Sequence, residues 1–164
     1  MNMYLMRHAI AVNSGGEIDD SQRPLTEIGR NKLIHIARNL KRMGVKFDFI
    51  VTSPYLRARQ TAEIVAHVLE LKPKHIHDSE NLTPLGFADR LIDEINAMGD
   101  IKNLLLVGHE PFLSQLIGVL VAGDASIDIG MKKAGVCRIS LQQLTHERCA
   151  TLKWLLPPAI FAEE

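Results

Sequence analysis

Short apolar runs alternate with segments of helical periodicity along most of the sequence, and this alternation restricts the chain to few architectures. The clearest run is NLLLVGH, residues 103–109, and its uninterrupted apolar stretch is typical of a strand buried on both faces. Five further segments have strand character, namely residues 3–6, 47–53, 75–77, 136–141 and 151–156. Strands that alternate with helices form a largely parallel sheet covered on both faces, so we expect a three-layer α/β/α fold.

The helices between these runs are marked by apolar residues three and four positions apart. The first has Thr26 as its predicted N-cap and ends at Gly44. The second is predicted to begin with Ser53 as N-cap and Pro54 at the first helical position. Two further helices are expected at about residues 91–98 and 111–121, and a polar loop at residues 13–24.

The length of 164 residues suits one domain with its own core, so we expect a single domain spanning residues 1–164. Lys and Arg balance Asp and Glu at 19 each, which argues against a nucleic-acid-binding protein held by bulk charge.

No apolar run approaches the roughly 20 residues of a membrane span. Arg7 interrupts the apolar run near the N-terminus, so we expect neither a membrane partner nor a signal peptide. Cys137 and Cys149 are too few for a disulfide framework, which favours the reduced cytoplasm.

Charged and polar residues gather where three of the predicted strands end. The first strand runs into Arg7 and His8, and the central strand ends at His109. The helix after the second strand carries Arg57 in its first turn. Ligands of parallel sheets bind beyond the carboxyl ends of strands, where helix N-termini add partial positive charge. Two arginines and two histidines at one edge therefore predict an anion site that suits a tetrahedral phosphate.

The chemistry of these residues indicates phosphoryl transfer. A neutral imidazole can attack phosphorus, and His8 is the candidate nucleophile because it follows its strand directly. Its other ring nitrogen would donate to a backbone carbonyl and so fix the attacking tautomer. His109, preferably as an imidazolium, would neutralise one phosphoryl oxygen, and Arg7 and Arg57 would spread charge over the others. Taken singly, each residue has an ordinary alternative as a surface pair, a solvated helix arginine or a capping histidine.

Four motifs resemble elements of the histidine phosphatase superfamily, which has the phosphoglycerate mutase-like fold. They are LMRHA at 5–9, RPLTEIG at 23–29, SPYLRARQTAE at 53–63 and VGHEP at 107–111, in the order in which the family has them. The resemblance implies that His8 is the phosphorylated nucleophile and that Arg7, Arg57 and His109 form its phosphate pocket. Arg23 is implied at the pocket rim.

The short length, together with RPLT and the LTPLG of residues 82–86, is similar to the small phosphohistidine phosphatases that act on two-component phosphotransfer domains. Two positions depart from the family's pattern. Ala9 stands where the signature has glycine, and Asn81 stands where the family has an acid that protonates an alkoxide. Glu80 is the nearest acid, but one residue of slip along a strand would point it to the opposite face. An imidazole leaves more easily than an alkoxide, so this loss fits a phosphohistidine substrate.

We therefore expect a phosphohistidine phosphatase that needs no metal or cofactor and acts on a phosphorylated protein histidine. One alternative is a phosphatase of small phosphate esters on the same fold. The chain lacks long insertions between Glu63 and Leu104 that would build a lid over a small molecule. The other alternative is a non-catalytic phosphate-binding module, against which the four intact site residues argue.

Two short basic or histidine-rich motifs stand outside this pattern. His75 and His77 have the H-x-H spacing of zinc ligands, but further ligands are missing from the motif, which favours a surface pair. Lys132 and Lys133 are either an ordinary solvated pair, which we favour, or a feature that helps to dock an acidic partner surface.

Overall fold

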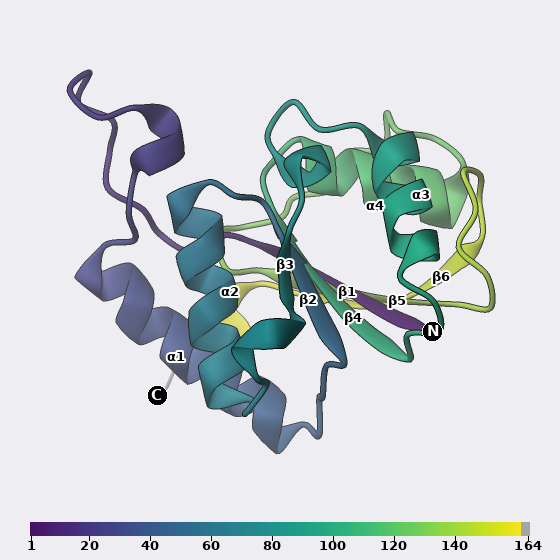
Figure 1. Ribbon diagram of the computed structural model, residues 1–164, viewed down its shortest axis with the longest axis horizontal. Helices are drawn as coiled ribbons and strands as arrows, with labels where there is room; N and C mark the ends of the chain where they lie inside the picture. Colours follow the sequence, from purple (N-terminus) through teal and green to yellow (C-terminus); the bar gives the residue numbers. More distant parts are fainter. Residues whose placement is uncertain (162–164) are drawn as a thin grey trace.

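A sheet of six strands forms the centre of the computed structural model, which describes residues 1–161 (Figure 1). The strands are β1 (Asn2–Arg7), β2 (Phe49–Thr52), β3 (Ile76–Asp78), β4 (Asn103–Gly108), β5 (Val136–Leu141) and β6 (Ala150–Leu156). Their order is β3-β2-β4-β1-β5-β6, with β3, β2, β4 and β1 parallel and β5 and β6 antiparallel. The predicted largely parallel sheet is confirmed, with an antiparallel edge.

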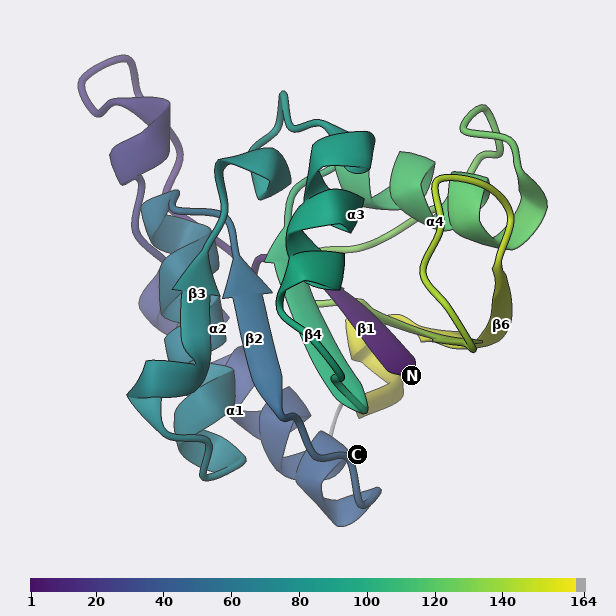
Figure 2. The same ribbon diagram turned by 45° about the vertical axis from the view of Figure 1, so that its right-hand side comes forward.

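Helices cover both faces of this sheet. They are α1 (Glu27–Arg42), α2 (Leu56–Val68), α3 (Ala88–Ala97) and α4 (Phe112–Ala122). Figures 1 and 2 show α1 and α2 on one face and α3 and α4 on the other. Alternate residues of one strand enter opposite cores, because successive strand side chains point to opposite faces. Leu105 packs in the core that contains residues of α1 and α2, and Leu106 packs in the core that contains residues of α3 and α4. The three-layer α/β/α prediction is therefore confirmed.

The two predicted N-caps have different outcomes. The Thr26 hydroxyl accepts a hydrogen bond from the Gly29 backbone N–H at 2.9 Å, so that cap is confirmed. The Ser53 cap is wrong, because α2 begins at Leu56 with Tyr55 as its N-cap. The Ser53 hydroxyl still accepts from the Tyr55 N–H at 3.3 Å, but it lies at the end of β2, outside the helix.

Residues 13–24, predicted as a polar loop, extend outward beyond α2 in Figure 1 and contain the short 3-10 helix η1 (Asp20–Gln22). The base of the loop is closed by a backbone hydrogen bond from Val12 to Pro24 at 2.9 Å and by a bridge between Ala11 and Leu25. η1 lies against α2. The closed base therefore holds this loop beside the first turn of α2.

The H-x-H motif divides between two elements. His75 ends the 3-10 helix η2 (Pro73–His75), and His77 lies in β3. Both rings contact Phe49, with centroids 5.1 and 5.5 Å away. Within residues 1–161, no group of three or more His, Cys, Asp or Glu side chains is arranged to hold a metal ion. Over the same residues, no helix combines the length and apolarity needed to cross a membrane.

Candidate active site

Three residues from separate parts of the chain meet at the carboxyl edge of the parallel strands. His8 follows β1, His109 follows β4, and Arg57 lies in the first turn of α2, which follows β2. These strands are neighbours in the sheet, so their ends converge. All three residues are buried, with 6, 2 and 3% of their surfaces exposed. A buried cluster of two imidazoles and a guanidinium is costly unless its members bond to one another, and here they do.

The ring of His8 is fixed by two hydrogen bonds. Its Nδ1 lies 2.7 Å from the Ala9 carbonyl, which accepts only, so Nδ1 carries the proton and donates. Arg57 Nε donates to His8 Nε2 at 3.2 Å, which requires a lone pair on Nε2. Both bonds select the tautomer that the sequence analysis expected for an attacking imidazole.

His109 is held between two different partners. Its Nδ1 lies 3.4 Å from an Arg57 terminal nitrogen, which donates only, so Nδ1 is the acceptor. The proton then resides on Nε2, which lies 2.8 Å from the Ser53 hydroxyl oxygen. Ser53 is fully buried at the end of β2. The sequence predicts Ser53 as a helix cap, so this site residue was not among those that the sequence indicated.

Burial keeps both histidines neutral. The pKa of His8 is lowered from 6.5 to about 4, mainly by burial; the bond to Ala9 raises it, and the charges of Arg57 and Arg7 contribute to lowering it. Burial also lowers the pKa of His109 to about 3, with smaller contributions from His8 and Arg57. His109 is therefore neutral in the free protein, because a second buried positive charge next to Arg57 is unfavourable. The imidazolium expected next to a phosphoryl oxygen stays a prediction.

Arg57 is also bound by a residue that the sequence analysis missed. One terminal nitrogen donates to the Asp20 backbone carbonyl at 2.5 Å, and the other donates to Asp20 Oδ2 at 3.1 Å. Arg23 binds the other carboxylate oxygen of Asp20 through Nε, at 2.8 Å, and reaches the Val12 carbonyl at 3.0 Å. Arg23 therefore lies at the rim of the cluster, joined to it through Asp20. Apart from its place in the loop, nothing in the sequence marked Asp20.

The Arg7 side chain makes its hydrogen bond to a different part of the chain. Its terminal nitrogen NH1 donates to the Met131 carbonyl at 3.0 Å, and its buried Nε has no hydrogen-bond partner within residues 1–161. The charge of Arg7 nevertheless contributes to the lowered pKa of His8. The structure thus joins three of the four predicted residues by direct contact and places the fourth nearby with an unused donor.

The acid position differs from the expectation. Residues 80–82 form the 3-10 helix η3 (Glu80–Leu82) and no strand, so the argument from strand faces does not apply. Asn81 donates to the Glu94 carboxylate at 3.1 Å, and Glu80 is exposed. Among residues 1–161, the hydrogen bonds of His8, Arg57 and His109 do not involve Glu80.

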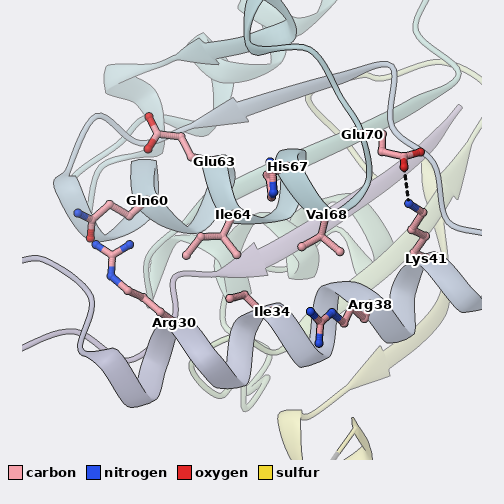
Figure 3. A pocket seen from close by; sticks show the side chains of 10 residues that line it. All are labelled: Arg30, Ile34, Arg38, Lys41, Gln60, Glu63, Ile64, His67, Val68 and Glu70. Carbon is pink, nitrogen blue, oxygen red and sulfur yellow. Dashed lines mark ion pairs between the residues drawn. The ribbon is translucent and has the colours of Figure 1, made fainter.

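A cavity of about 710 Å³ lies elsewhere, in the groove between α1 and α2 (Figure 3). Ile34, Ile64 and Val68 form its apolar centre, and Lys41 pairs with Glu70 at 3.0 Å at one end. None of the four candidate catalytic residues lines this groove. The chemistry therefore concentrates at the sheet edge, away from this cavity.

Comparisons with known proteins agree with this geometry. The model of the histidine phosphatase superfamily (branch 1) matches residues 3–83. The phosphohistidine phosphatase SixA of Escherichia coli (strain K12) is 31% identical over 126 residues, which cover 76% of each chain. The chain belongs to the histidine phosphatase superfamily. Within the superfamily it falls in the small SixA-like branch, and it is a phosphatase.

Two further comparisons extend this result over the whole superfamily domain. An uncharacterized protein of Picosynechococcus sp. (strain ATCC 27264 / PCC 7002 / PR-6) is 36% identical over 168 residues, covering 96% of this histidine phosphatase and 100% of the relative. The solved structure of the protein histidine phosphatase SixA complexed with tungstate superimposes with a TM-score of 0.86 at 26% identity, covering 99% of this chain and 100% of that one. The architecture is therefore the phosphoglycerate mutase-like fold that the motifs predicted.

Proposed function

We propose that this phosphatase removes the phosphoryl group from a phosphorylated protein histidine, transferring it first to His8 and then to water. The observation that carries the proposal is the bond from His8 Nδ1 to the Ala9 carbonyl, which leaves the Nε2 lone pair next to Arg57. A neutral, fixed imidazole surrounded by cationic donors suits attack on phosphorus. The name of the E. coli relative, a phosphohistidine phosphatase, supports the substrate class.

In the first step, the hydrogen bond from Arg57 Nε to His8 Nε2 breaks, and the freed Nε2 lone pair forms a bond to phosphorus while the bond from phosphorus to the substrate's imidazole nitrogen breaks. A substrate ring that is protonated on its other nitrogen leaves as neutral imidazole, so this step needs no separate proton donor. Arg57 and Arg7 supply positive charge for the phosphoryl oxygens. His109 would be a further donor only as an imidazolium, because in the free protein its single N–H is bonded to Ser53. Water then attacks phosphorus, the bond to His8 breaks with its electron pair returning to Nε2, and both hydrogens of the water leave on the product as dihydrogen phosphate.

The carboxylate that contacts the cluster, Asp20, is a poor proton donor, which favours a phosphohistidine over an alkyl ester. Partial burial raises the pKa of Asp20, but hydrogen bonds from Arg57 and Arg23 outweigh this and leave that pKa below its ordinary value. Glu110, which follows His109, differs from Asp20: burial raises its pKa despite the hydrogen bonds that its carboxyl group accepts from the Ser114 backbone N–H and hydroxyl, and those bonds hold the carboxyl group on Ser114. An alkoxide would require proton donation that an imidazole does not.

The proposal is tested by trapping the intermediate. Rapid-quench mass spectrometry during turnover of a phosphohistidine protein should find acid-labile phosphate on His8. His8→Ala should abolish turnover, and His77→Ala, which changes an exposed histidine of β3, should leave turnover unchanged. Substantial turnover by a folded His8→Ala variant would contradict the mechanism.

A substrate panel separates this function from that of a small-ester phosphatase. A phosphohistidine protein should be hydrolysed with a higher kcat/KM than sugar phosphates, and the reverse order would favour the small-ester alternative. We further propose, from the motif resemblance, that the substrate is a phosphotransfer domain of two-component signalling. The same proposal places the enzyme in the cytoplasm as a single domain of residues 1–164.

A further inference from the structure

A recess of about 480 Å³ adjoins the candidate active site, and the charged residues that line it within residues 1–161 are all cationic. Arg7, Lys32, Lys132 and Lys133 line it, and its other lining residues are apolar side chains, glycine and proline. No Asp or Glu is among them. The whole chain has a formal net charge of zero, so this excess of positive charge is a local feature. We call it the cationic recess.

The lysines of the cationic recess have no acidic partner among the residues that the structure describes. All three are exposed, and the ion pairs found within residues 1–161 include none of them. The buried Nε of Arg7 also lacks a hydrogen-bond partner there. A buried donor left unpaired costs free energy that an arriving acceptor recovers. Both observations indicate that the recess takes an anionic group.

Backbone hydrogen bonds join the turn that carries Lys132 and Lys133 to the end of β1, which His8 follows. The Ala134 N–H lies 3.0 Å from the Arg7 carbonyl and 3.2 Å from the His8 carbonyl. The Gly135 N–H donates to the Lys132 carbonyl at 2.8 Å and closes the turn. The two lysines are therefore held at a fixed place relative to His8, and the charge of Lys133 contributes to the lowered pKa of His8.

Lys32 reaches the recess because α1 packs closely against the segment after His8. The Thr26 N–H donates to the Ile10 carbonyl at 2.9 Å. A Cβ at Gly29 would lie only 2.2 Å from the same carbonyl oxygen, so only glycine permits this approach. Lys32 follows Gly29 by three residues and shares its helix face. The cationic recess thus has the turn of Lys132 and Lys133 on one side of residues 9 and 10, and α1 with Lys32 on the other.

We propose that the cationic recess binds acidic side chains that flank the phosphohistidine of a protein substrate. This inference rests on the proposed function, since it names a feature of the same substrate. Lysines at the rim attract carboxylates, while the apolar floor formed by Ala9 and Ile10 suits the methylene groups of glutamate. The same lysines repel basic flanks, so the recess selects among phosphohistidine proteins.

A matched pair of peptides tests the recess. Both carry one phosphohistidine, and they differ only in whether glutamate or glutamine flanks it. The wild-type enzyme should hydrolyse the acidic peptide with a kcat/KM about tenfold higher, and added salt should reduce this ratio. The double variant Lys32→Glu/Lys132→Glu should reverse the preference. Thermal unfolding of each variant checks that it folds.

The control is a second double variant with the same change in net charge. Lys46 and Lys74 are exposed and precede β2 and β3. They therefore lie at the amino ends of the parallel strands, whereas His8 and His109 follow the carboxyl ends. Lys46→Glu/Lys74→Glu should keep the preference for the acidic peptide. Equal kcat/KM for both peptides in the wild type would overturn the recess inference and leave the proposed function standing. Turnover of p-nitrophenyl phosphate with no hydrolysis of either peptide would overturn both.

Discussion

Two regions of the molecule differ in how far their charged side chains are exposed. They are the catalytic cluster of His8, Arg57 and His109 and the groove between α1 and α2. In the cluster the Arg57 side chain is 4% exposed and bonds to both imidazoles. In the groove the Lys41 and Glu70 side chains are 46 and 79% exposed, and water solvates both (Figure 3). Burying a charge costs free energy, whereas an exposed ion pair costs and contributes little. The buried charges therefore indicate function better than the volume of a cavity does.

The largest expected difference between the two regions is in catalysis. Arg57→Ala should lower kcat/KM on a phosphohistidine substrate by ~10²–10³, the usual effect of losing one donor to the transition state. Arg59, two residues away, pairs with Glu63 and Asp78 on the surface, and Arg38 lines the groove. Arg59→Ala and Arg38→Ala should each change kcat/KM less than about threefold. Equal effects of all three substitutions would break the comparison.

The second expected difference is in the pH dependence of stability. Folded His8 has a pKa of about 4 and folded His109 of about 3, against 6.5 for an ordinary histidine, so the unfolded chain binds more protons between pH 6.5 and 4. The free energy of unfolding should therefore fall as the pH drops through this window, by roughly 2 kcal/mol for each histidine between pH 7 and 5.

Urea unfolding at the two pH values measures this loss. His8→Gln should remove the share of His8, because glutamine does not titrate. His67→Gln serves as the control, since His67 is exposed in the groove and its replacement should leave the loss unchanged. An identical pH dependence in wild type and His8→Gln would show that His8 is not buried as a neutral imidazole.

A smaller effect is expected at Glu80, an exposed carboxylate outside both regions. Glu80→Gln should slow hydrolysis of a phosphohistidine protein less than about threefold, because the leaving imidazole needs little acid help, whereas general acid catalysis contributes ~10²–10⁴ when an alkoxide leaves. Steady-state rates on phosphohistidine and on an alkyl phosphate check this. A large loss on both substrates would show that Glu80 reaches the site and would reopen ester substrates.

The smallest expected effect is on the ion pair of the groove. Lys41→Ala should change the free energy of unfolding by no more than about 1 kcal/mol, because exposed pairs contribute little and salt screens them. Glu70→Ala should give a similar value, and neither variant should alter kcat/KM. A loss of activity in either variant would show that the groove is coupled to the sheet edge.

Much of the fold could be predicted because it depends on local patterns. The apolar run of β4 and the spacing of apolar residues in α1 each determine their own element. His8 and His109 could be placed because each directly follows a strand, and the ends of parallel strands converge. The same argument placed Arg57 next to them.

Contacts made across loops could not be predicted in this way. Asp20 reaches Arg57 from 37 residues away, and only the path of the 13–24 loop brings them together. Ser53 has the sequence context of a helix cap, but the register of β2 against β4 places it beside His109. The neutral state of His109 depends on total burial, which no single motif encodes.

The hydrogen bonds from Arg57 to Asp20 affect any anion that approaches His8. The backbone carbonyl and the carboxylate of Asp20 already occupy both terminal nitrogens of that guanidinium. An incoming phosphoryl group that binds these nitrogens therefore competes with Asp20 for their N–H groups. The apparent binding free energy of the anion is then the difference between two states of Arg57, one bound to the anion and one bound to Asp20. The cost of desolvating Arg57 is similar in both states and largely cancels. Anion binding at this position is thus an exchange between two acceptors of the same guanidinium.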